Sequence, residues 1–325
     1  MKILFTSTHI PSFVREDVEI LQQHFHVDHL LTRGWTSLFA IPVHTLRSDV
    51  TFTWFASVYS AFVVFFARLF GKRSVLVVGG VDVAKYPEVN YGIWLTPWKA
   101  IFVKYALRNA LKVLIVDPFQ KQEAMRLAVY DGENIEYVPT GYDPGFWISS
   151  GPRESLVLMV AACQDEGRMK AKGVDVFLAA AGLLSDTRFV LVGLGKEMLE
   201  KVRDQSSSNV ELVPFVQRNE LLRYYQRAKV YCQPSYIEGL PNSLCEAMLC
   251  GCIPVGTNVG GIPTAISDIG FLVQYGDAAG LGKAIRKALL APDSVGTRAR
   301  GHIARNFTLQ KREATLVRIL TEFSR

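Results

Sequence analysis

The stretch PSYIEGLPNSLCEAMLCGCIPVGTNVGGIP, residues 234–263, carries two glutamates, Glu238 and Glu246, with seven residues between them. The run KVYCQPS, residues 229–235, predicts a strand that leads into this stretch, and SLCEAMLCG at residues 243–251 predicts a helix. Glu238 is therefore expected just after a strand and Glu246 on the following helix. In open parallel sheets, ligands bind beyond such strand ends.

The residues between the two glutamates set up the start of the predicted helix. Gly239 and Pro241 indicate a tight turn, and Asn242 or Ser243 can cap the helix. Backbone N–H groups and the helix dipole at that end favour a phosphate or a sugar hydroxyl oxygen. A nearby carboxylate can accept hydrogen bonds from paired hydroxyls. Together with Leu240, these turn residues are our candidate contacts for a nucleotide sugar.

Short β-rich runs alternate with longer helical runs on both sides of this stretch. Strands are predicted in the first half at residues 2–8, 26–32, 50–54, 74–80, 112–117 and 134–140, with helices at 13–25, 56–70, 99–112 and from 119. The second half repeats the pattern, with strands predicted at 155–163, 188–195, 209–215, 229–235 and 253–257. This alternation predicts βαβ units and parallel sheets.

The domain organisation follows from length and from one change in composition. A chain of 325 residues suits two domains. The segment TGYDPGFWISSGPRES is rich in Gly, Pro and Ser, which predicts a linker and a boundary near residue 150. We therefore expect the α/β class, with two Rossmann-like, doubly wound domains that face a cleft, over residues 1–150 and 151–307.

Composition and charge exclude several classes of protein. Hydrophobic residues make up 49% of the chain and charged residues 20%, which predicts a globular protein with a full core. The net charge is +6, but no Lys/Arg block with interleaved aromatic residues occurs, so we expect no nucleic-acid partner. Five cysteines, all in the second half, suit reduced thiols in the cytosol. The start MKILFTSTHIPSF predicts a first strand rather than a signal peptide, and the apolar run over 54–70, interrupted by Arg68, predicts a buried helix rather than a membrane span.

Basic residues and glycines follow two other predicted strands of the second half. The segment EGRMKAKG places Arg168 and Lys172 near a predicted helix start, where cations can neutralise a diphosphate, and Lys170 is an alternative to either. The segment VGLGKE places Gly193 and Gly195 after a strand, where the backbone could approach a nucleotide.

Two polar residues follow predicted strands of the first half. Asp82 comes directly after an apolar strand and two glycines, so we expect it near an acceptor hydroxyl, as a base or an orienting group. A structural cap on the next helix is the alternative role for Asp82. His9 follows the first strand and is a candidate for the same acceptor side.

The Glu-x7-Glu spacing, with PS-x3-EG-x-P and CG-x-PV around it, resembles the motif of family 4 retaining glycosyltransferases (glycosyl transferases group 1). The segments EGRMKAKG and VGLGKE are similar to the Arg…Lys-Gly pair and the V-G-x-G turn of that family, and the resemblance extends over residues 155–290. In the first half it consists of VPTGYDPGF and GGVDVA. Thr140 stands where the family usually has Asn, and the glycine-rich first loop of many members is missing after Thr8.

The resemblance implies a GT-B fold in which the second domain binds a nucleoside-diphosphate sugar and the first binds the acceptor. It also implies that a final helix over 308–325 packs back on the first domain. By resemblance, Glu238 contacts the donor sugar and Glu246 the ribose, while Arg168 and Lys172 stabilise the leaving diphosphate. It further implies retention of configuration, no metal or other cofactor, and carbohydrate acceptors such as lipid-linked or polysaccharide precursors.

Two functions of other classes stay open. The first is a sugar-nucleotide-binding partner subunit that has lost catalysis, for which the altered first loop leaves room. The second is a nicotinamide oxidoreductase, which the VGLGKE turn could serve. Met198 occupies the third glycine position of the dinucleotide fingerprint, however, and no such fingerprint follows the first strand.

The segment around residue 98 allows two interpretations. Tyr91, Trp94 and Trp98 precede a predicted helix whose cations recur every four or five residues from Lys99 to Lys112. This arrangement suits contact with an anionic cytoplasmic membrane surface, and it equally suits a surface helix of a soluble domain. We expect a cytoplasmic protein, with peripheral contact at the inner face of the membrane as the open alternative.

Overall fold

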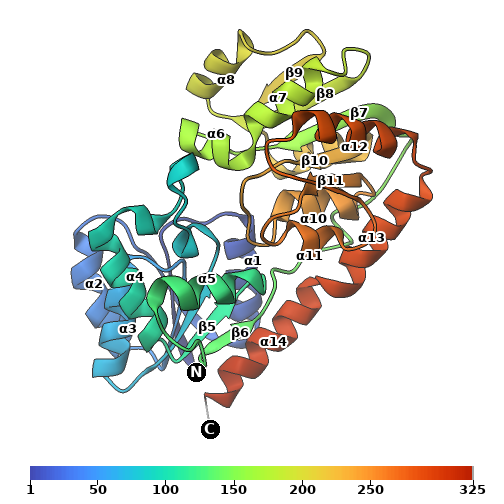
Figure 1. Cartoon of the computed structure of the whole chain (residues 1–325). Helices are drawn as coiled ribbons and strands as arrows, with labels where there is room; N and C mark the ends of the chain where they lie inside the picture. The colour runs from blue at the N-terminus through green and yellow to red at the C-terminus, as the bar shows by residue number, and fades with distance from the viewer. Residues whose placement is uncertain (324–325) are drawn as a thin grey trace. The chain divides into compact units, whose positions relative to one another are not determined.

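The computed structural model describes residues 1–323, which form two compact units (Figure 1). Unit 1 consists of Met1–Pro87, Tyr91–Gly141 and the chain from Leu309 onward, and unit 2 consists of Glu88–Asn90 and Tyr142–Thr308. Residues 324 and 325, the end of the predicted C-terminal helical segment, lie outside the described residues.

Unit 1 is built on a parallel six-stranded sheet in the order β2-β1-β3-β4-β5-β6. Its strands are β1 (Lys2–Ser7), β2 (His26–Leu31), β3 (Val50–Trp54), β4 (Arg73–Val78), β5 (Lys112–Ile115) and β6 (Ile135–Tyr137). Ile3 of β1 aligns with Val50 of β3, and Val50 in turn aligns with Arg73 of β4. The central strands read as apolar runs because helices cover both of their faces.

The helices of unit 1 divide into two packed groups. They are α1 (Ser12–His24), α2 (Thr36–Leu46), α3 (Val58–Leu69), α4 (Pro97–Asn109), α5 (Phe119–Ala128) and α14 (Leu309–Glu322). Helices α1 and α14 pack on each other, while α2, α3, α4 and α5 pack in series. Three short 3₁₀ turns, Val81–Val83, Pro87–Val89 and Ile93–Leu95, lie between β4 and α4.

A buried ion pair joins α14 to α1. The Arg312 guanidinium donates to both Asp17 carboxylate oxygens, at 2.5 and 2.6 Å, and to the carbonyl oxygens of Val138 and Pro139. The indole N–H of Trp54 also donates to Asp17, at 2.7 Å. Both charged side chains are almost fully buried, so every donor and acceptor here has to be satisfied within unit 1.

Unit 2 is built on a second parallel six-stranded sheet, in the order β12-β11-β10-β7-β8-β9. Its strands are β7 (Glu154–Val160), β8 (Arg188–Leu194), β9 (Val210–Pro214), β10 (Ala228–Gln233), β11 (Ile253–Thr257) and β12 (Phe271–Val273). The chain order runs outward from β7 to one edge of the sheet and from β10 to the other. The adjacent strands β7 and β10 therefore form the point where the winding reverses. The prediction of an α/β chain with two parallel, doubly wound sheets is confirmed.

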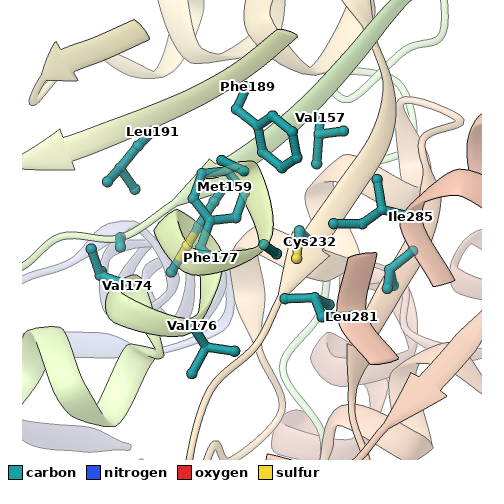
Figure 2. Close-up of a cluster of buried hydrophobic side chains, with 14 of the residues drawn as sticks. Val157, Met159, Val174, Val176, Phe177, Phe189, Leu191, Cys232, Leu281 and Ile285 are labelled. Atoms are coloured by element: carbon teal, nitrogen blue, oxygen red, sulfur yellow. The ribbon is translucent and has the colours of Figure 1, made fainter. Parts of the chain in front are cut away.

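Helices of unit 2 cover this sheet and close its core. They are α6 (Glu166–Lys172), α7 (Val174–Gly182), α8 (Lys196–Arg203), α9 (Arg218–Arg227), α10 (Asn242–Leu249), α11 (Ile262–Ile266), α12 (Ala278–Leu290) and α13 (Ser294–Asn306). Figure 2 shows strand residues such as Val157 and Phe189 facing Phe177 of α7 and Ile285 of α12. Phe177 and Phe189 meet edge to face at 5.3 Å. All five cysteines are free and buried in unit 2.

Three predicted elements of unit 1 need correction. The helix predicted over 99–112 is α4, which ends at Asn109, and Lys112 begins β5 instead. The apolar run 54–70, predicted as one buried helix, is the end of β3 followed by α3, which is buried on one side only. Helix α2 was not predicted at all, because Pro42 lies inside it and two of its buried residues are polar. Within residues 1–323, no helix has the length and hydrophobicity needed to span a membrane.

Candidate active site

The carboxyl ends of β7 and β10 bring the two candidate segments of unit 2 together. The chain leaves β7 at Val160 and enters α6, which carries Arg168 and Lys172. It leaves β10 at Gln233 and enters the loop that carries Glu238. Because the winding of the sheet reverses between these strands, their loops diverge and leave room at this edge.

Glu238 is held through one of its two carboxylate oxygens. Lys172 Nζ donates to Oε1 at 2.7 Å, Ser235 Oγ at 2.9 Å and Gln233 Nε2 at 3.0 Å. The Glu238 side chain keeps 12% of its surface exposed. Within the described chain all three donors converge on Oε1, so Oε2 retains its capacity to accept hydrogen bonds from a ligand.

Gln233 and Ser235 were not among the predicted site residues, and both are buried. Gln233 Nε2 also donates to Ser235 Oγ at 2.8 Å, and Tyr231 OH donates to Gln233 Oε1 at 3.1 Å. This chain of hydrogen bonds fixes the base of the Glu238 loop. One sequence signal could have found it: polar residues that continue an otherwise apolar strand at the end where ligands bind.

The two glycines of the GGIP segment allow a second loop to pass close behind Glu238. Gly260 has a positive φ of 51°, and a Cβ there would lie 2.2 Å from the Glu238 carbonyl oxygen. Gly261 N–H donates to that same oxygen at 3.1 Å. The backbone of Glu238 is therefore fixed from a segment that is more than twenty residues away in sequence.

Helix α10 begins at Asn242 without a side-chain cap, so the prediction that Asn242 or Ser243 caps it is wrong. Asn242 Oδ1 instead accepts a hydrogen bond from Tyr142 OH at 2.9 Å, and Ser243 Oγ lies 3.4 Å from Gln233 Oε1. Pro241 is the N-cap residue, and the preceding Gly239 and Leu240 are buried. The first N–H groups of α10 thus depend on partners other than a capping side chain.

Glu246 lies in the second turn of α10 and is almost buried. Tyr225 OH donates to its Oε2 at 3.1 Å. Burial, and then the neighbouring Glu246 carboxylate, raises the pKa of Tyr225 well above its ordinary value, so this hydroxyl stays protonated and acts as a donor. The contact positions the Glu246 carboxylate from behind.

The two candidate cations occupy different settings on α6. Arg168 is exposed and lies 3.6 Å from Asp165, the residue that caps the helix. Lys172 is the last residue of α6 and has one third of its side chain exposed. Lys170 lies between them and is exposed, and Lys172 is the residue that the fold brings to the Glu238 carboxylate. Burial raises the pKa of the nearby Cys163 thiol to about 11, so that thiol is neutral.

The two glycines after β8 pack against the chain itself. Gly193 has a φ of 108°, and a Cβ there would lie 3.1 Å from the Ala161 carbonyl oxygen. Gly195 N–H donates to the Cys163 carbonyl oxygen at 2.9 Å. Both glycines therefore border the loop that follows β7, beside the segment that carries the cations.

In unit 1, Asp82 is fully buried. Its carboxylate accepts hydrogen bonds from the backbone N–H groups of Ala56, Gly79 and Gly80, at 2.7 to 3.1 Å. Burial raises the pKa of Asp82, and the backbone donors oppose that shift. All three donors precede Asp82 in the chain and the turn after β4 has no side-chain cap, so the carboxylate does not cap the next helix either. Its burial offers no surface to an acceptor hydroxyl in this conformation. We therefore treat Asp82 as an anchor of the turn after β4.

His9 lies at the reversal point of the first sheet, where the adjacent strands β1 and β3 end. The ring is exposed and stacks on Phe55 at 4.5 Å, and Thr8 Oγ1 lies 3.0 Å from its Nδ1. In both units, ligands are expected at the carboxyl ends of the two adjacent strands where the winding of the sheet reverses, and His9 lies at that position in unit 1.

The second half of the chain matches a known protein family. Residues 158–290 match the family described as Glycosyl transferases group 1. A protein named D-inositol 3-phosphate glycosyltransferase, from Mycobacterium sp. (strain JLS), is 27% identical over 192 residues, which cover 53% of this chain and 43% of that protein. The gpi3 subunit of phosphatidylinositol N-acetylglucosaminyltransferase from Schizosaccharomyces pombe is 22% identical over 275 residues, covering 73% and 57%. The chain thus spans about half the length of these relatives.

Solved structures share the whole fold at low sequence identity. Sucrose-phosphate synthase from Thermosynechococcus elongatus superposes with a TM-score of 0.81 at 16% identity, covering 99% of this chain and 98% of that one. Anabaena HepE in complex with UDP-glucose superposes with a TM-score of 0.81 at 14% identity, covering 99% and 100%. At these identities the likeness establishes the fold alone.

Proposed function

Because residues 158–290 belong to the glycosyl transferases group 1 family and the chain has the GT-B type of fold, we propose that it is a retaining glycosyltransferase. It transfers a sugar from a nucleoside-diphosphate sugar to an acceptor hydroxyl. Residues 151–307 bind the donor, residues 1–150 bind the acceptor, and the segment 308–325 belongs with the acceptor domain.

The observation that carries this proposal is the Glu238 carboxylate, anchored through Oε1 by Lys172, Ser235 and Gln233. Oε2 is left to accept from sugar hydroxyls, and Lys172 has further N–H donors for a phosphate oxygen. Glu246 of α10 accepts hydrogen bonds from the ribose hydroxyls, and Tyr225 of α9 positions its carboxylate. A carboxylate pair combined with a cation suits a nucleotide sugar, which presents hydroxyls at both ends and a diphosphate between them.

We propose that the reaction follows a front-face path. The bond between the anomeric carbon and the diphosphate oxygen breaks as the acceptor oxygen bonds to the same face of that carbon. The acceptor proton passes to an oxygen of the departing diphosphate. Lys172 and Arg168 stabilise the negative charge that develops on this leaving group, and Glu238 orients the sugar. Since these cations lie at the site, we propose that no metal is required.

The nucleotide base and the acceptor are proposed from the relatives. Anabaena HepE has been crystallised in complex with UDP and with UDP-glucose, so uracil is the first base to test. The mycobacterial and yeast relatives are named for inositol-containing acceptors. A carbohydrate or lipid-linked acceptor, used by a cytoplasmic enzyme at the inner membrane surface, is consistent with those names and with the basic helix α4.

Thermal stabilisation by nucleotides tests the donor site, because a ligand that binds only the native state raises its stability. We expect one of UDP, GDP and ADP to raise the midpoint of unfolding. Glu246→Ala should abolish that rise, whereas Tyr225→Phe should keep most of it. A shift with NADH alone would favour an oxidoreductase. No shift with any of these ligands, in a folded protein, would contradict donor binding at this site.

Turnover separates an enzyme from a binding partner that has lost catalysis. Lys172→Ala should lower the single-turnover rate by about 10²-fold or more while donor affinity changes little, because the cation acts mainly on charge that develops in the transition state. Lys170→Ala, on the same helix, is the matched control and should leave the rate unchanged. Equal rates in both variants would contradict the role of Lys172. Donor binding without turnover against any acceptor would support the binding partner.

A further inference from the structure

Helix α2 buries small residues and exposes large apolar ones. Ser37 and Thr45 are buried beside a single isoleucine, whereas Trp35, just before the helix, is 82% exposed and Phe39 is 78% exposed. Val43 and Leu46 continue the exposed stripe. Large apolar side chains on the solvent side of a helix are unusual for a soluble domain and indicate a surface that contacts something else.

The neighbouring helices extend this surface. Phe65 and Leu69 of α3 are exposed, as are Trp98 and Ile101 of α4, at helical spacings of three or four residues. Helix α2 packs on α3, and α3 packs on α4, so the three helices form one layer of unit 1 (Figure 1). We call the exposed side of this layer the α2–α4 face. It is defined by Trp35, Phe39, Phe65, Leu69, Trp98 and Ile101.

The face is hollowed at two places. A groove of about 300 Å³ between α3 and α4 is lined only by apolar and aromatic side chains, including Phe65 and Ile101. A pocket of about 450 Å³ near the starts of the helices is lined by Trp35, Trp98 and Lys99 among others. Such concavities can accept hydrocarbon chains.

The three helices and the segments that flank them carry basic residues and no acidic ones. Residues 33–47, 57–73 and 92–112 contain nine Lys or Arg and no Asp or Glu, although the first 150 residues as a whole carry 14 basic and 13 acidic residues. Of these nine, only Lys112 has a carboxylate partner within the described residues: its Nζ lies 3.1 Å from Glu136 Oε2. Within residues 1–323 the other eight have no carboxylate partner at ion-pair distance, although Arg68, Lys72, Arg73 and Arg108 line one pocket together with Asp131 and Glu133.

We propose that the α2–α4 face docks on a membrane surface that contains anionic lipid. Its apolar side chains would enter the boundary between headgroups and acyl chains, and its cations would lie at the lipid phosphates. A second copy of this chain is a poorer occupant, because two such faces would bring like charges together. The proposal extends the membrane contact suggested by α4 to two helices whose role the sequence did not indicate. It does not rest on the donor site.

Vesicle binding by the full chain tests the proposal. We expect co-sedimentation with vesicles of phosphatidylcholine and phosphatidylglycerol, little with phosphatidylcholine alone, and release at high salt, which screens the cations. Tryptophan emission should shift to the blue on binding, since Trp35 and Trp98 are the exposed tryptophans of the described chain. The double variant Trp35→Ser with Phe39→Ser should weaken vesicle binding at least about tenfold, because it removes two exposed rings that the proposal inserts into the membrane.

A double variant of α12 in unit 2, Lys287→Glu with Leu290→Ser, is the matched control. Leu290 is 86% exposed, so this variant changes a similar exposed apolar position and also removes a cation. It should bind vesicles like the native chain. Unchanged binding by the α2 variant, equal loss in the control, or a dimer that dissociates in the α2 variant would each overturn the proposal. Stabilisation by nucleotide, measured without lipid, reports the donor site separately.

Discussion

At the scale of single residues, the candidate site depends on close backbone approaches as much as on its charged groups. Gly173 separates Lys172 from α7 with a φ of 72°, and a Cβ there would lie 1.9 Å from the Pro234 carbonyl oxygen. Pro234 is followed at once by Ser235, which donates to Glu238. A glycine at this position therefore lets the segment that carries Lys172 pack directly against the segment that carries Ser235 and Glu238.

Replacing Gly173 should cost more than replacing a glycine of the same backbone conformation elsewhere. Gly151 has a φ of 71° and nothing within 4 Å of its Cβ position. Gly151→Ala should lower the free energy of unfolding by about 1 kcal/mol, the cost of left-handed backbone alone. Gly173→Ala should cost about 2–4 kcal/mol, since the Pro234 segment must also move. Urea unfolding measures both, and equal losses would show that the contact with Pro234 does not constrain the chain.

At the scale of elements, α14 depends on one buried charge. Arg312 links it to Asp17 of α1 and to the carbonyl groups after β6, while its guanidinium also lies 5.5 Å from the Trp54 ring centre. By contrast, Arg318 of the same helix is half exposed and pairs with Glu136 and Glu322. One helix therefore carries a buried and an exposed ion pair.

Arg312→Met should destabilise unit 1 by about 3–5 kcal/mol, because it leaves the Asp17 carboxylate buried without its counter-charge. Arg318→Met on the same helix should cost less than about 1 kcal/mol, the usual value for an exposed pair. Thermal and urea unfolding of both variants provide the comparison. If the two variants lose similar stability, the ion pair between Arg312 and Asp17 is not what holds α14 against α1.

At the scale of the whole molecule, two histidines couple stability to pH, one in each unit. Burial lowers the pKa of His29, and burial also lowers the pKa of His302 in spite of a backbone contact that opposes the shift. Their unfolded-state pKa is near the ordinary value of about 6.5. Just below that pH the unfolded chain binds more protons than the folded one, so stability must fall as pH falls.

We therefore expect the urea midpoint to decrease from pH 7 towards pH 5.5. His29→Gln with His302→Gln should flatten this decrease, because neither replacement titrates. At pH 8 both histidines are neutral in either state, so the pH-dependent difference between native and variant should vanish there. An identical slope for the two proteins would assign the acid sensitivity to other groups, such as the carboxylate of Glu154, whose pKa is lowered by its hydrogen bonds with Arg227.

The sequence by itself determined the α/β class, the two parallel sheets and the positions of Glu238, Glu246, Arg168 and Lys172 along the chain. It could do so because the alternation of strand and helix is local, and because the motif spacing is a property of one continuous segment. The family match over residues 158–290 agrees with those motifs. Helix α2 escaped prediction because Pro42 lies inside it and two of its three buried residues, Ser37 and Thr45, are polar.

Only the tertiary structure decided which groups meet. Lys172 and Glu238 are 66 residues apart, and Tyr225 reaches Glu246 from another helix. Asp82 follows a strand end, as an acceptor-side residue would, yet its carboxylate is taken up by backbone donors. The physical reason is that burial and hydrogen-bond partners depend on packing between distant segments. The acid-free α2–α4 face likewise emerges only when three separate helices are packed into one layer.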